Sequence, residues 1–381
     1  MPTAVLFFII YLFLPAAAPK FESQVVDEKV SIGYGLAIGD VDGDKKPDIL
    51  LADKKQFVWY RNGDWKRFVM ADNLTESDNV CIAARDIDGD GRVEVAVGAQ
   101  WNPSETSDTV KSGAVFYLIR PKDATQSWKP VRLHHEPVIH RMRWVRTSRD
   151  AHQLVVLPLH GRGNKGGEGK GVRVFAYEMP ANPEMPWRLR LIDESMHLTH
   201  NLDVVPGRNG ETVLIGGKEG IKGFRYDRGK WVTWHEKPWV VEGGSFGELR
   251  STDTGRLIAG IEPMHGTELT VYSPGLGGAL QRHVLTGDLN QGHALAVADL
   301  LRAGSQQVVV GWREPNKESK VGVKLYARPK DDSSAWQAYW IDDNGMACED
   351  LQVADLNADG KAEIIAAGRA TKNLKIYWNR N

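Results

Sequence analysis

Cysteine is scarce in this 381-residue sequence, and neither sign of charge is in excess. Cys81 and Cys348 are the only two cysteines, so disulfides cannot form a framework for the fold, and we expect both thiols to be free and buried. The 48 lysines and arginines balance the 49 aspartates and glutamates, and no basic run is interleaved with aromatic residues. The sequence also lacks a P-loop, a dinucleotide-binding fingerprint and a Ser-His-Asp order. This composition argues against nucleic acid or an acidic membrane surface as a partner.

Long apolar runs are also missing, except for one at the N-terminus. Residues 4–14 are almost wholly apolar and are followed by Pro15 and three alanines, although no lysine or arginine precedes them. The run is shorter than the roughly 20 residues that a transmembrane helix needs, and small residues after an apolar core are typical of signal-peptide cleavage. We therefore predict a signal peptide over residues 1–18, no integral membrane segment, and a mature domain over residues 19–381 that is secreted or periplasmic.

The main positive feature of the sequence is a repeat. Three stretches, residues 40–48, 86–94 and 355–363, are near-copies, each preceded by an apolar run of small residues and followed by β-forming residues. Four further copies share this frame but lose most of its acidic positions, and they begin near His140, His200, Ser245 and His293. Together these make seven copies, about 50 residues apart.

Each copy predicts β-strands and no helix. Two apolar strands flank the loop, a third strand follows, and a fourth begins at a tryptophan in five of the copies. Seven four-stranded units predict an all-β fold, a seven-bladed β-propeller. The last copy stops after its third strand, and Phe21–Val26 is an unassigned strand near the other end of the sequence. Pairing between these two segments would complete the last blade and close the ring.

The three near-identical loops place oxygen-bearing side chains at alternate positions, a spacing that suits a hard cation. The candidate calcium ligands are Asp40, Asp42, Asp44 and Asp48 in the first loop, Asp86, Asp88, Asp90 and Glu94 in the second, and Asp355, Asn357, Asp359 and Glu363 in the third. A metal-free turn capped by the same carboxylates is the alternative. Lys45 replaces a glycine in the first loop, so we expect structural calcium foremost in the other two. The copy at Asp299 lacks the other acids and should be empty.

These acidic loops resemble the FG-GAP or VCBS-type repeat, which occurs in integrin α-subunit propellers and in many exported bacterial proteins. The resemblance extends over residues 21–381 and implies the propeller fold. It implies no particular activity, because the same repeat is used by adhesion modules and by enzymes.

Aligning the seven copies at the start of their inner strands predicts a ring of side chains around a central axis. The ring consists of Tyr34, Val80, His140, His200, Ser245, His293 and Glu349. The chain has only eleven histidines, so three of them in seven ring positions are more than chance would place there. Three imidazoles can hold zinc with a fourth position open to water or substrate, so we predict zinc at His140, His200 and His293. Histidines that merely line a wet channel are the alternative.

Loops that follow the second strands should share the histidine face. They contribute Trp101, His160, Lys218, Glu262, His265, Trp312, Arg313, Glu314 and Arg369. A rim of aromatic and charged side chains suits a polar, sugar-like ligand. Candidates for a base that removes a proton next to a carbonyl are Glu349, His265 and Tyr34, and Arg313 is a further catalytic candidate.

A narrower resemblance lies in the sixth copy. Gly292–Asp299, Val310–Glu314 and Val321–Tyr326 resemble the propeller domain of aldos-2-ulose dehydratases. Members of that family eliminate water from keto-sugars such as 1,5-anhydrofructose and use zinc at a propeller cleft. The resemblance therefore implies a zinc-dependent lyase with a carbohydrate or keto-sugar ligand. Because the sequence ends at the propeller, an isomerisation carried by a further domain is not expected.

Two other functions fit the same face. A calcium-stabilised propeller without catalysis would bind a glycan or a protein partner with its rim. A polysaccharide lyase would use arginine and histidine without a transition metal. The shared register of the histidines favours the metal-dependent lyase over the binding module.

Overall fold

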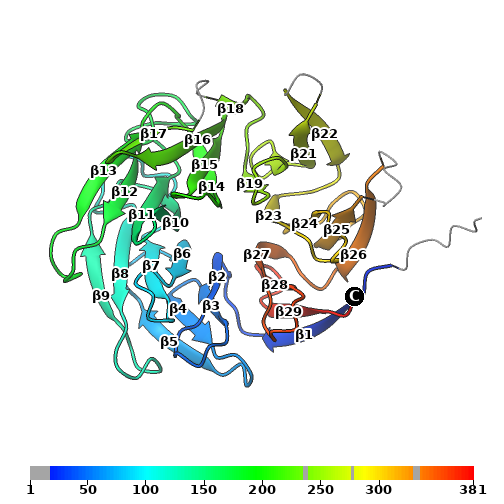
Figure 1. Cartoon of the computed structure of the whole chain (residues 1–381), viewed down its shortest axis with the longest axis horizontal. Coiled ribbons are helices and arrows are strands. Elements are labelled where there is room, and N and C mark those ends of the chain that lie inside the picture. Colours follow the sequence, from blue (N-terminus) through cyan, green and yellow to red (C-terminus); the bar gives the residue numbers. More distant parts are fainter. Residues whose placement is uncertain (1–17, 235–238, 276–278, 329–334) are drawn as a thin grey trace, which may run out of the picture.

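The chain forms a ring of seven β-sheets around a central axis (Figure 1). The computed structural model describes residues 18–234, 239–275, 279–328 and 335–381. The expected signal peptide lies outside the described residues, apart from its last position. Across the described ranges, no helix is long and apolar enough to cross a membrane. The predicted all-β, seven-bladed propeller is confirmed.

The blades are numbered in chain order, and their strands are given from the axis outward. Blades 1 to 3 contain β2 (Gly35–Gly39), β3 (Asp48–Ala52), β4 (Gln56–Tyr60) and β5 (Arg67–Asp72); β6 (Cys81–Arg85), β7 (Glu94–Ala99), β8 (Ala114–Ile119) and β9 (Lys129–Leu133); and β10 (Ile139–Ser148), β11 (Ala151–Pro158), β12 (Val174–Glu178) and β13 (Arg188–Asp193). Blades 4 and 5 contain β14 (Thr199–Val205), β15 (Thr212–Gly217), β16 (Gly220–Asp227) and β17 (Lys230–Thr233), with β18 (Trp239–Glu242) also paired to β16; and β19 (Glu248–Ser251), β20 (Ile258–Glu262), β21 (Glu268–Pro274) and β22 (Leu280–Thr286). Blades 6 and 7 contain β23 (Gly292–Ala298), β24 (Gln307–Trp312), β25 (Gly322–Ala327) and β26 (Gln337–Asp343); and β27 (Cys348–Ala354), β28 (Glu363–Gly368), β29 (Leu374–Asn379) and β1 (Phe21–Asp27).

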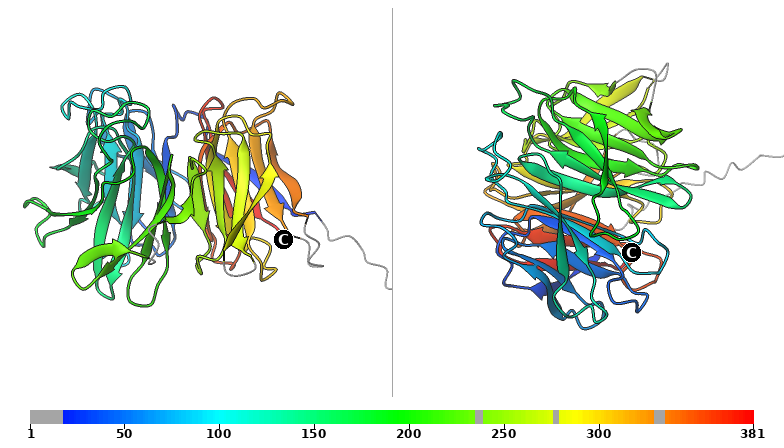
Figure 2. Two further views of the ribbon diagram at one scale, coloured as in Figure 1. Left: turned by 90° about the horizontal axis from the view of Figure 1, so that it is seen from above. Right: turned by 90° about the vertical axis from the view of Figure 1, so that its left-hand side faces the viewer.

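Blade 7 is built from both ends of the described chain. Strand β1 pairs antiparallel with β29 and forms the outer strand of the blade, so the expected closure is confirmed (Figure 1). Side chains reinforce the seam: the Trp378 indole donates to the Gln24 side chain at 2.7 Å. The Tyr60 hydroxyl of blade 1 donates to Asp27 at 2.6 Å. Side views show the strands of all blades running between the two faces of the ring (Figure 2). The fold therefore depends on a contact between its two ends.

The core lies between neighbouring blades rather than in one central mass. The second strands are almost entirely buried, as the apolar run at Ile49–Ala52 shows. Trp187 at the start of an outer strand packs 5.5 Å from Tyr117 of the preceding blade, measured between ring centroids. Cys81 and Cys348 are free and buried on inner strands, as expected. Interlocked blades bury apolar surface on both faces of each sheet and so supply most of the folding free energy.

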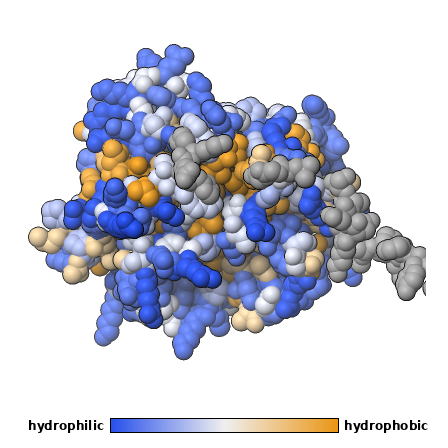
Figure 3. Space-filling model, turned by 45° about the horizontal axis from the view of Figure 1, so that its top comes forward, coloured by the Kyte–Doolittle hydropathy of each residue, from blue (hydrophilic) through white to orange (hydrophobic). Residues whose placement is uncertain are grey.

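The face seen in Figure 3 is mostly hydrophilic, with apolar residues gathered in a few patches between polar side chains. Few large apolar side chains are strongly exposed among the described residues, and they are Val25, Val110, Met185, Leu191 and Val284. These come from separate segments of the chain. The pattern is typical of a propeller whose apolar residues serve mainly the packing between blades.

Candidate functional site

Four ring residues are brought to the axis by the same local device, a β-bulge. In blade 3, Ile139 pairs with Pro158 and Arg141 pairs with Leu157, which leaves His140 as an extra residue on its strand. The same irregularity occurs in three other inner strands, at His200, His293 and Glu349. A bulge inserts one unpaired residue and re-aims its side chain. The repeat thus turns three imidazoles and one carboxylate toward the funnel.

Each bulged histidine is fixed by a carbonyl of the next blade. The Nδ1 atom of His140 lies 2.6 Å from the His200 carbonyl oxygen, and that of His293 lies 2.6 Å from the Glu349 carbonyl oxygen. Nδ1 of His200 makes the equivalent hydrogen bond to the Gly247 carbonyl. A carbonyl oxygen only accepts, so Nδ1 carries the proton and donates in each ring. Nε2 of each ring therefore carries the lone pair, which can accept a hydrogen bond or bind a metal.

A fourth histidine enters the funnel from the rim. His265 lies in the loop between β20 and β21, and its Nε2 is 2.7 Å from Nε2 of His200. The loop approaches the inner strand so closely that a Cβ at Gly247 would lie 2.9 Å from the His265 backbone nitrogen. Glycine at this position therefore permits the approach. The His265 ring centroid is 4.6 Å from that of His200 and 4.9 Å from that of His293.

The histidines that converge most closely are not the three grouped by register. His200, His265 and His293 each offer a ring nitrogen, and these atoms lie within 4.8 Å of one another. His140 remains adjacent, with its ring centroid 4.3 Å from that of His200. However, Nη1 of Arg141 lies 3.3 Å from Nε2 of His140 and donates to it. In the structure the third histidine of the closest group is therefore His265 and not His140, which the alignment of the repeats had indicated. His265 joins the group because its loop extends from the rim into the funnel.

All four imidazoles are held in their neutral form. Burial lowers the pKa of His140, His200 and His293 well below the ordinary value of 6.5, and nearby Arg141 lowers all three further. Burial, followed by the positive charge of Arg313, lowers the pKa of His265 to about 4. Neutral imidazole is the form in which histidine binds transition metals, although Nε2 of His265 here donates to Nε2 of His200 and would have to release this hydrogen bond to bind one. The cluster therefore has the donor set of a three-histidine zinc site.

Glu349 is engaged by two arginines. Its buried carboxylate accepts two hydrogen bonds from Nη1 of Arg313 at 3.0 Å and one from Arg369 at 3.1 Å. Arg313 also donates to Gln291. Because both guanidinium groups donate to its carboxylate, Glu349 positions Arg313 and Arg369 and is not a free base. They set two guanidinium groups beside the histidines, where negative charge on a ligand would be stabilised.

Tyr34 lies on the same side of the funnel. Its hydroxyl donates to Asp78 at 3.4 Å, and the Arg369 guanidinium lies 5.6 Å from its ring centroid. Burial, and then the charge of Asp78, raises the pKa of Tyr34 to about 12. The phenol is therefore protonated at neutral pH. Lys55 pairs with the other side of Asp78 at 3.7 Å.

Other rim candidates are only partly at the funnel. Trp101 stands over His140, with 5.2 Å between ring centroids. Glu262 is buried and accepts hydrogen bonds from Thr270 and Tyr272 at the outer part of blade 5. The Lys218 ammonium donates to the Gly166 carbonyl. Trp101 thus remains a candidate for ligand contact, whereas Glu262 and Lys218 support loops.

Sequence reasoning missed several polar residues that the structure brings to the site. Arg141 follows a bulged histidine, and Asp78 precedes the second inner strand by only a few residues. Glu248 lies below them, buried, with Oε1 3.7 Å from Nδ1 of His200 and 4.0 Å from Arg141. Burial raises the pKa of Glu248 to about 7. Alternation along the inner strands predicts opposite orientations for His140 and Arg141, and only the bulge brings both to the same site.

The acidic loops lie at the far ends of the inner strands, on the opposite face. Asp40, Asp42 and Asp48 have carboxylate oxygens within 4.8 Å of one another, as do Asp86, Asp88 and Asp90 of the second loop. The first aspartate of each loop also accepts two backbone N–H groups, as Asp86 does from Gly89 and Gly91. The first and second loops therefore combine clustered oxygens with a capped turn, and the third loop shares the capped turn.

Two observations bear on whether the acidic loops suit a cation. Oε1 of Glu363 in the third loop is buried and has no hydrogen-bond partner among the described residues, so an oxygen is left for a cation. In blade 6, Asp299 accepts the N–H groups of Ala303 and Gly304 in the same way, although the other acids are missing. The turn itself thus forms without a full ligand set. The third loop therefore leaves a buried carboxylate oxygen available to a cation, whereas the grouped carboxylates lie in the first and second loops.

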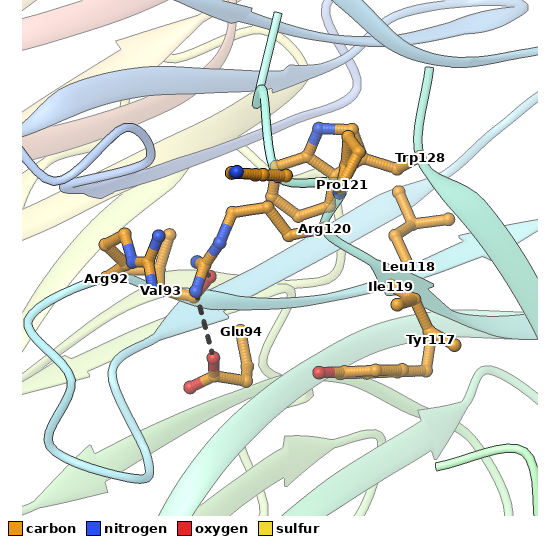
Figure 4. Close-up of a pocket in the computed structure, with 10 residues that line it drawn as sticks. Arg92, Val93, Glu94, Tyr117, Leu118, Ile119, Arg120, Pro121 and Trp128 are labelled. Atoms are coloured by element: carbon orange, nitrogen blue, oxygen red, sulfur yellow. Dashed lines mark hydrogen bonds and ion pairs between the residues drawn. The ribbon is translucent and has the colours of Figure 1, made fainter. Parts of the chain in front are cut away.

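The second loop borders a cavity of about 340 Å³ that contains basic side chains (Figure 4). Arg120 crosses this cavity toward Glu94, with 3.9 Å between charged atoms. Arg92 and Arg120 also reach Oδ2 of Asp90, at 2.7 and 3.2 Å. Two guanidinium groups therefore compete with a cation for Asp90.

Comparison with known families supports both resemblances. Residues 40–97 match the FG-GAP-like repeat, and residues 112–274 match the β-propeller domain of aldos-2-ulose dehydratase. The second match contains His140, His200 and His265, whereas the segments first used for this resemblance lie in blade 6. No curated protein matches the chain.

Solved structures share the propeller architecture. BBS1N, crystallised in complex with ARL6DN and soaked with lead, is 11% identical with a TM-score of 0.59, covering 96% of this chain and 97% of its own. A chain of the mitotic checkpoint complex is also 11% identical, with a TM-score of 0.58 and coverage of 100% of both chains. At this identity the likeness concerns the fold alone.

Proposed function

We propose that this protein is a zinc-dependent lyase that removes water from a keto-sugar at the histidine funnel. The observation that carries the proposal is the convergence of His200, His265 and His293, whose ring nitrogens lie within 4.8 Å of one another. The match of residues 112–274 to the aldos-2-ulose dehydratase propeller supports the substrate class. Zinc bound to these three histidines would act as a Lewis acid on the carbonyl oxygen of the substrate.

The surrounding residues suit the charge changes of such an elimination. Removing a proton next to a carbonyl places negative charge on oxygen, and Arg313 and Arg369 bring two positive charges beside the histidines. Glu349 keeps both guanidinium groups in position. The ring of Trp101 beside His140 offers an apolar face to a sugar. These roles follow from charge and position at one funnel.

Proton transfer is assigned to Tyr34 and Asp78. The phenol oxygen would take the proton next to the carbonyl while the phenol passes its own proton to Asp78, which it already contacts at 3.4 Å. The same pair would return a proton to the departing hydroxide. Tyr34→Phe should then reduce kcat by about 100-fold or more while zinc content stays unchanged.

The decisive experiment measures zinc and turnover together. His200→Ala should fold normally, lose roughly stoichiometric zinc and lose dehydration of 1,5-anhydrofructose, followed by ultraviolet absorbance of the enone product. His283→Ala, an exposed histidine on β22, is the matched control and should keep both. Full zinc occupancy in His200→Ala, or wild-type protein without transition metal, would contradict the lyase. The result would then favour a calcium-stabilised propeller that binds a glycan or a protein.

A further inference from the structure

A second cavity lies in the central channel, deeper than the histidines. It has a volume of about 420 Å³ and is lined by residues toward the ends of the inner strands β2, β6, β10, β14 and β27. Arg143 lines it and follows His140 by three residues, so the cavity lies about 10 Å farther along the axis at roughly 3.3 Å per residue. Its walls include apolar side chains such as Ile38, Ile82 and Val353. The volume is within the range of small-molecule sites, about 300–1,000 Å³.

Arg143 carries a charge that no carboxylate neutralises at close range. Its one hydrogen bond within the described residues runs from Nη1 to the Met142 carbonyl, at 2.9 Å. No carboxylate of the described residues lies within 4.0 Å of Arg143. A guanidinium has five N–H donors, so most of the hydrogen-bonding capacity of Arg143 is unused. Burial, and then the nearby positive charge of Arg250, lowers the pKa of Arg143 from its ordinary value, whereas Asp350 and Asp203 act in the opposite direction.

The charged side chains near Arg143 make their hydrogen bonds to other groups. Arg85, the other arginine of the cavity, makes two hydrogen bonds to Glu211 at 2.8 and 2.9 Å. Asp350 accepts the N–H groups of Leu36 and Leu351. With Arg85 paired, Arg143 is the guanidinium of the cavity whose N–H donors are mostly unused, although the carboxylates of Asp350 and Asp203 act on its charge from farther away. A ligand that offers acceptor oxygens is therefore favoured, and a carboxylate matches the donor fork of a guanidinium best.

A second polar group faces the same space. Gln352 lines the cavity, and its side-chain amide makes no hydrogen bond in the described part of the chain. An amide both donates and accepts, so it suits a hydroxyl group. The combination of a free guanidinium, a free amide and apolar walls differs from a site for an inorganic anion, because the walls would contact a carbon skeleton.

We propose that the axial cavity binds a small hydroxy acid, with Arg143 holding its carboxylate and Gln352 a hydroxyl. The planar fork of arginine matches the two oxygens of a carboxylate, and such bidentate pairs are among the stronger hydrogen bonds in proteins. The site is separate from the histidines and does not depend on the lyase proposal. The volume admits acids from glycolate to a six-carbon sugar acid.

Calorimetric titration of the full chain with sodium glycolate and sodium gluconate tests this site. Arg143→Gln should weaken binding of the better acid by about tenfold or more, because it removes the charge and the fork. Arg143→Lys keeps the positive charge but loses the two-pronged donor geometry, so its affinity should lie between those of wild type and Arg143→Gln. Gln352→Leu should weaken gluconate by about threefold to tenfold. Arg256→Gln, an exposed arginine with the same change of charge, should bind as wild type does.

Two further arms separate this site from its alternatives. His200→Ala disrupts the histidine site and should retain gluconate binding, so failure of the lyase proposal and failure of this one are distinguishable. Sodium phosphate and sodium chloride should bind at least tenfold more weakly than the better acid, a difference of about 1.4 kcal/mol. Equal binding of all anions would overturn the carboxylate assignment. Unchanged affinity in both Arg143 variants, or no acid binding in wild type, would overturn the site.

Discussion

His140 and His265 flank His200, yet their Nε2 atoms have different partners. Nε2 of His140 accepts from Arg141, whereas Nε2 of His265 faces Nε2 of His200 at 2.7 Å. A metal at His140 would have to displace a positively charged guanidinium from the ring nitrogen. A metal at His265 would replace only a hydrogen bond between two neutral rings. At the scale of single residues, His265 is therefore the better third ligand, and His140 serves to position Arg141.

Zinc content separates the two assignments. His265→Ala should reduce zinc from roughly one ion per chain to a small fraction, because a three-histidine site loses a ligand. His140→Ala should keep most of its zinc. Both are measured by mass spectrometry of purified, dialysed protein. Loss of zinc in His140→Ala with retention in His265→Ala would restore the ligand set expected from the register.

The lowered pKa values predict how stability depends on pH. The folded-state pKa of His265, about 4, is below its ordinary value of 6.5, so the unfolded chain binds more protons between these values. Stability should therefore fall as pH decreases from 6.5 toward 4, with a contribution from His265 on the order of 2 kcal/mol. His265→Asn should show a shallower decline in denaturant titrations. The exposed variant His283→Asn should follow wild type, and an equally steep decline in His265→Asn would contradict the assignment.

At the scale of elements, the acidic hairpin forms as a turn whether or not it has the acids that could bind a cation. In three blades the last acid of the loop accepts the N–H of its second residue, as Glu94 does from Ile87 at 3.0 Å. In blade 6, Gln307 makes a similar bond to Leu301 without a charge. The closing hydrogen bond thus requires no ion. What the acids add is clustered oxygen in the first and second loops, and in the third loop a buried Oε1 of Glu363 without a hydrogen-bond partner among the described residues.

Calcium should raise the melting temperature, and the third loop should account for most of the gain. A ligand at 100 times its dissociation constant adds about 2.7 kcal/mol to the free energy of unfolding. Asp359→Ala should remove most of this gain and Asp88→Ala a smaller part, because Arg92 and Arg120 already occupy Asp90 in the second loop. Asp299→Ala is the control and should respond to calcium as wild type does. A melting curve indifferent to calcium and to chelator would leave all these loops as plain turns.

At the scale of the whole molecule, the ring is closed by hydrogen bonds between residues far apart in sequence. Phe21 pairs with Asn379 and Gln24 with Ile376 across the seam of blade 7. An open seam would expose the full edge of β29 and part of the apolar core between blades 7 and 1. The seam therefore couples the stability of every blade to one outer strand.

Removing that strand should destabilise the entire ring. Deletion of residues up to 27 is expected to lower the free energy of unfolding by about 3 kcal/mol or more and to cause aggregation, measured by calorimetry and light scattering. Deletion of residues up to 18 keeps β1 and is the matched control. A protein that lacks β1 and melts at the temperature of the control would show that closure contributes little.

The repeat and the turn chemistry are local properties, and for that reason the sequence alone determined the fold. Short apolar runs and loop aspartates act within one blade, tryptophans recur at the start of outer strands, and the orphan strand at Phe21 indicated the closure. The register also brought His140, His200, His293 and Glu349 to one ring. The acidic loops could be located to the residue because their spacing is a sequence property.

Only the tertiary structure decided which side chains meet. His265 reaches the cluster through a rim loop, and its approach depends on Gly247, just before the inner strand β19, a contact that no spacing encodes. Glu349, a candidate base from the sequence, positions Arg313 and Arg369 in the structure, because the segments that carry these arginines converge on its carboxylate. The N–H donors of Arg143 are left unused because the nearby carboxylates of Asp350 and Asp203 accept backbone N–H groups of adjacent blades. Strand periodicity is set by near neighbours, whereas charge pairing is set by distances between blades.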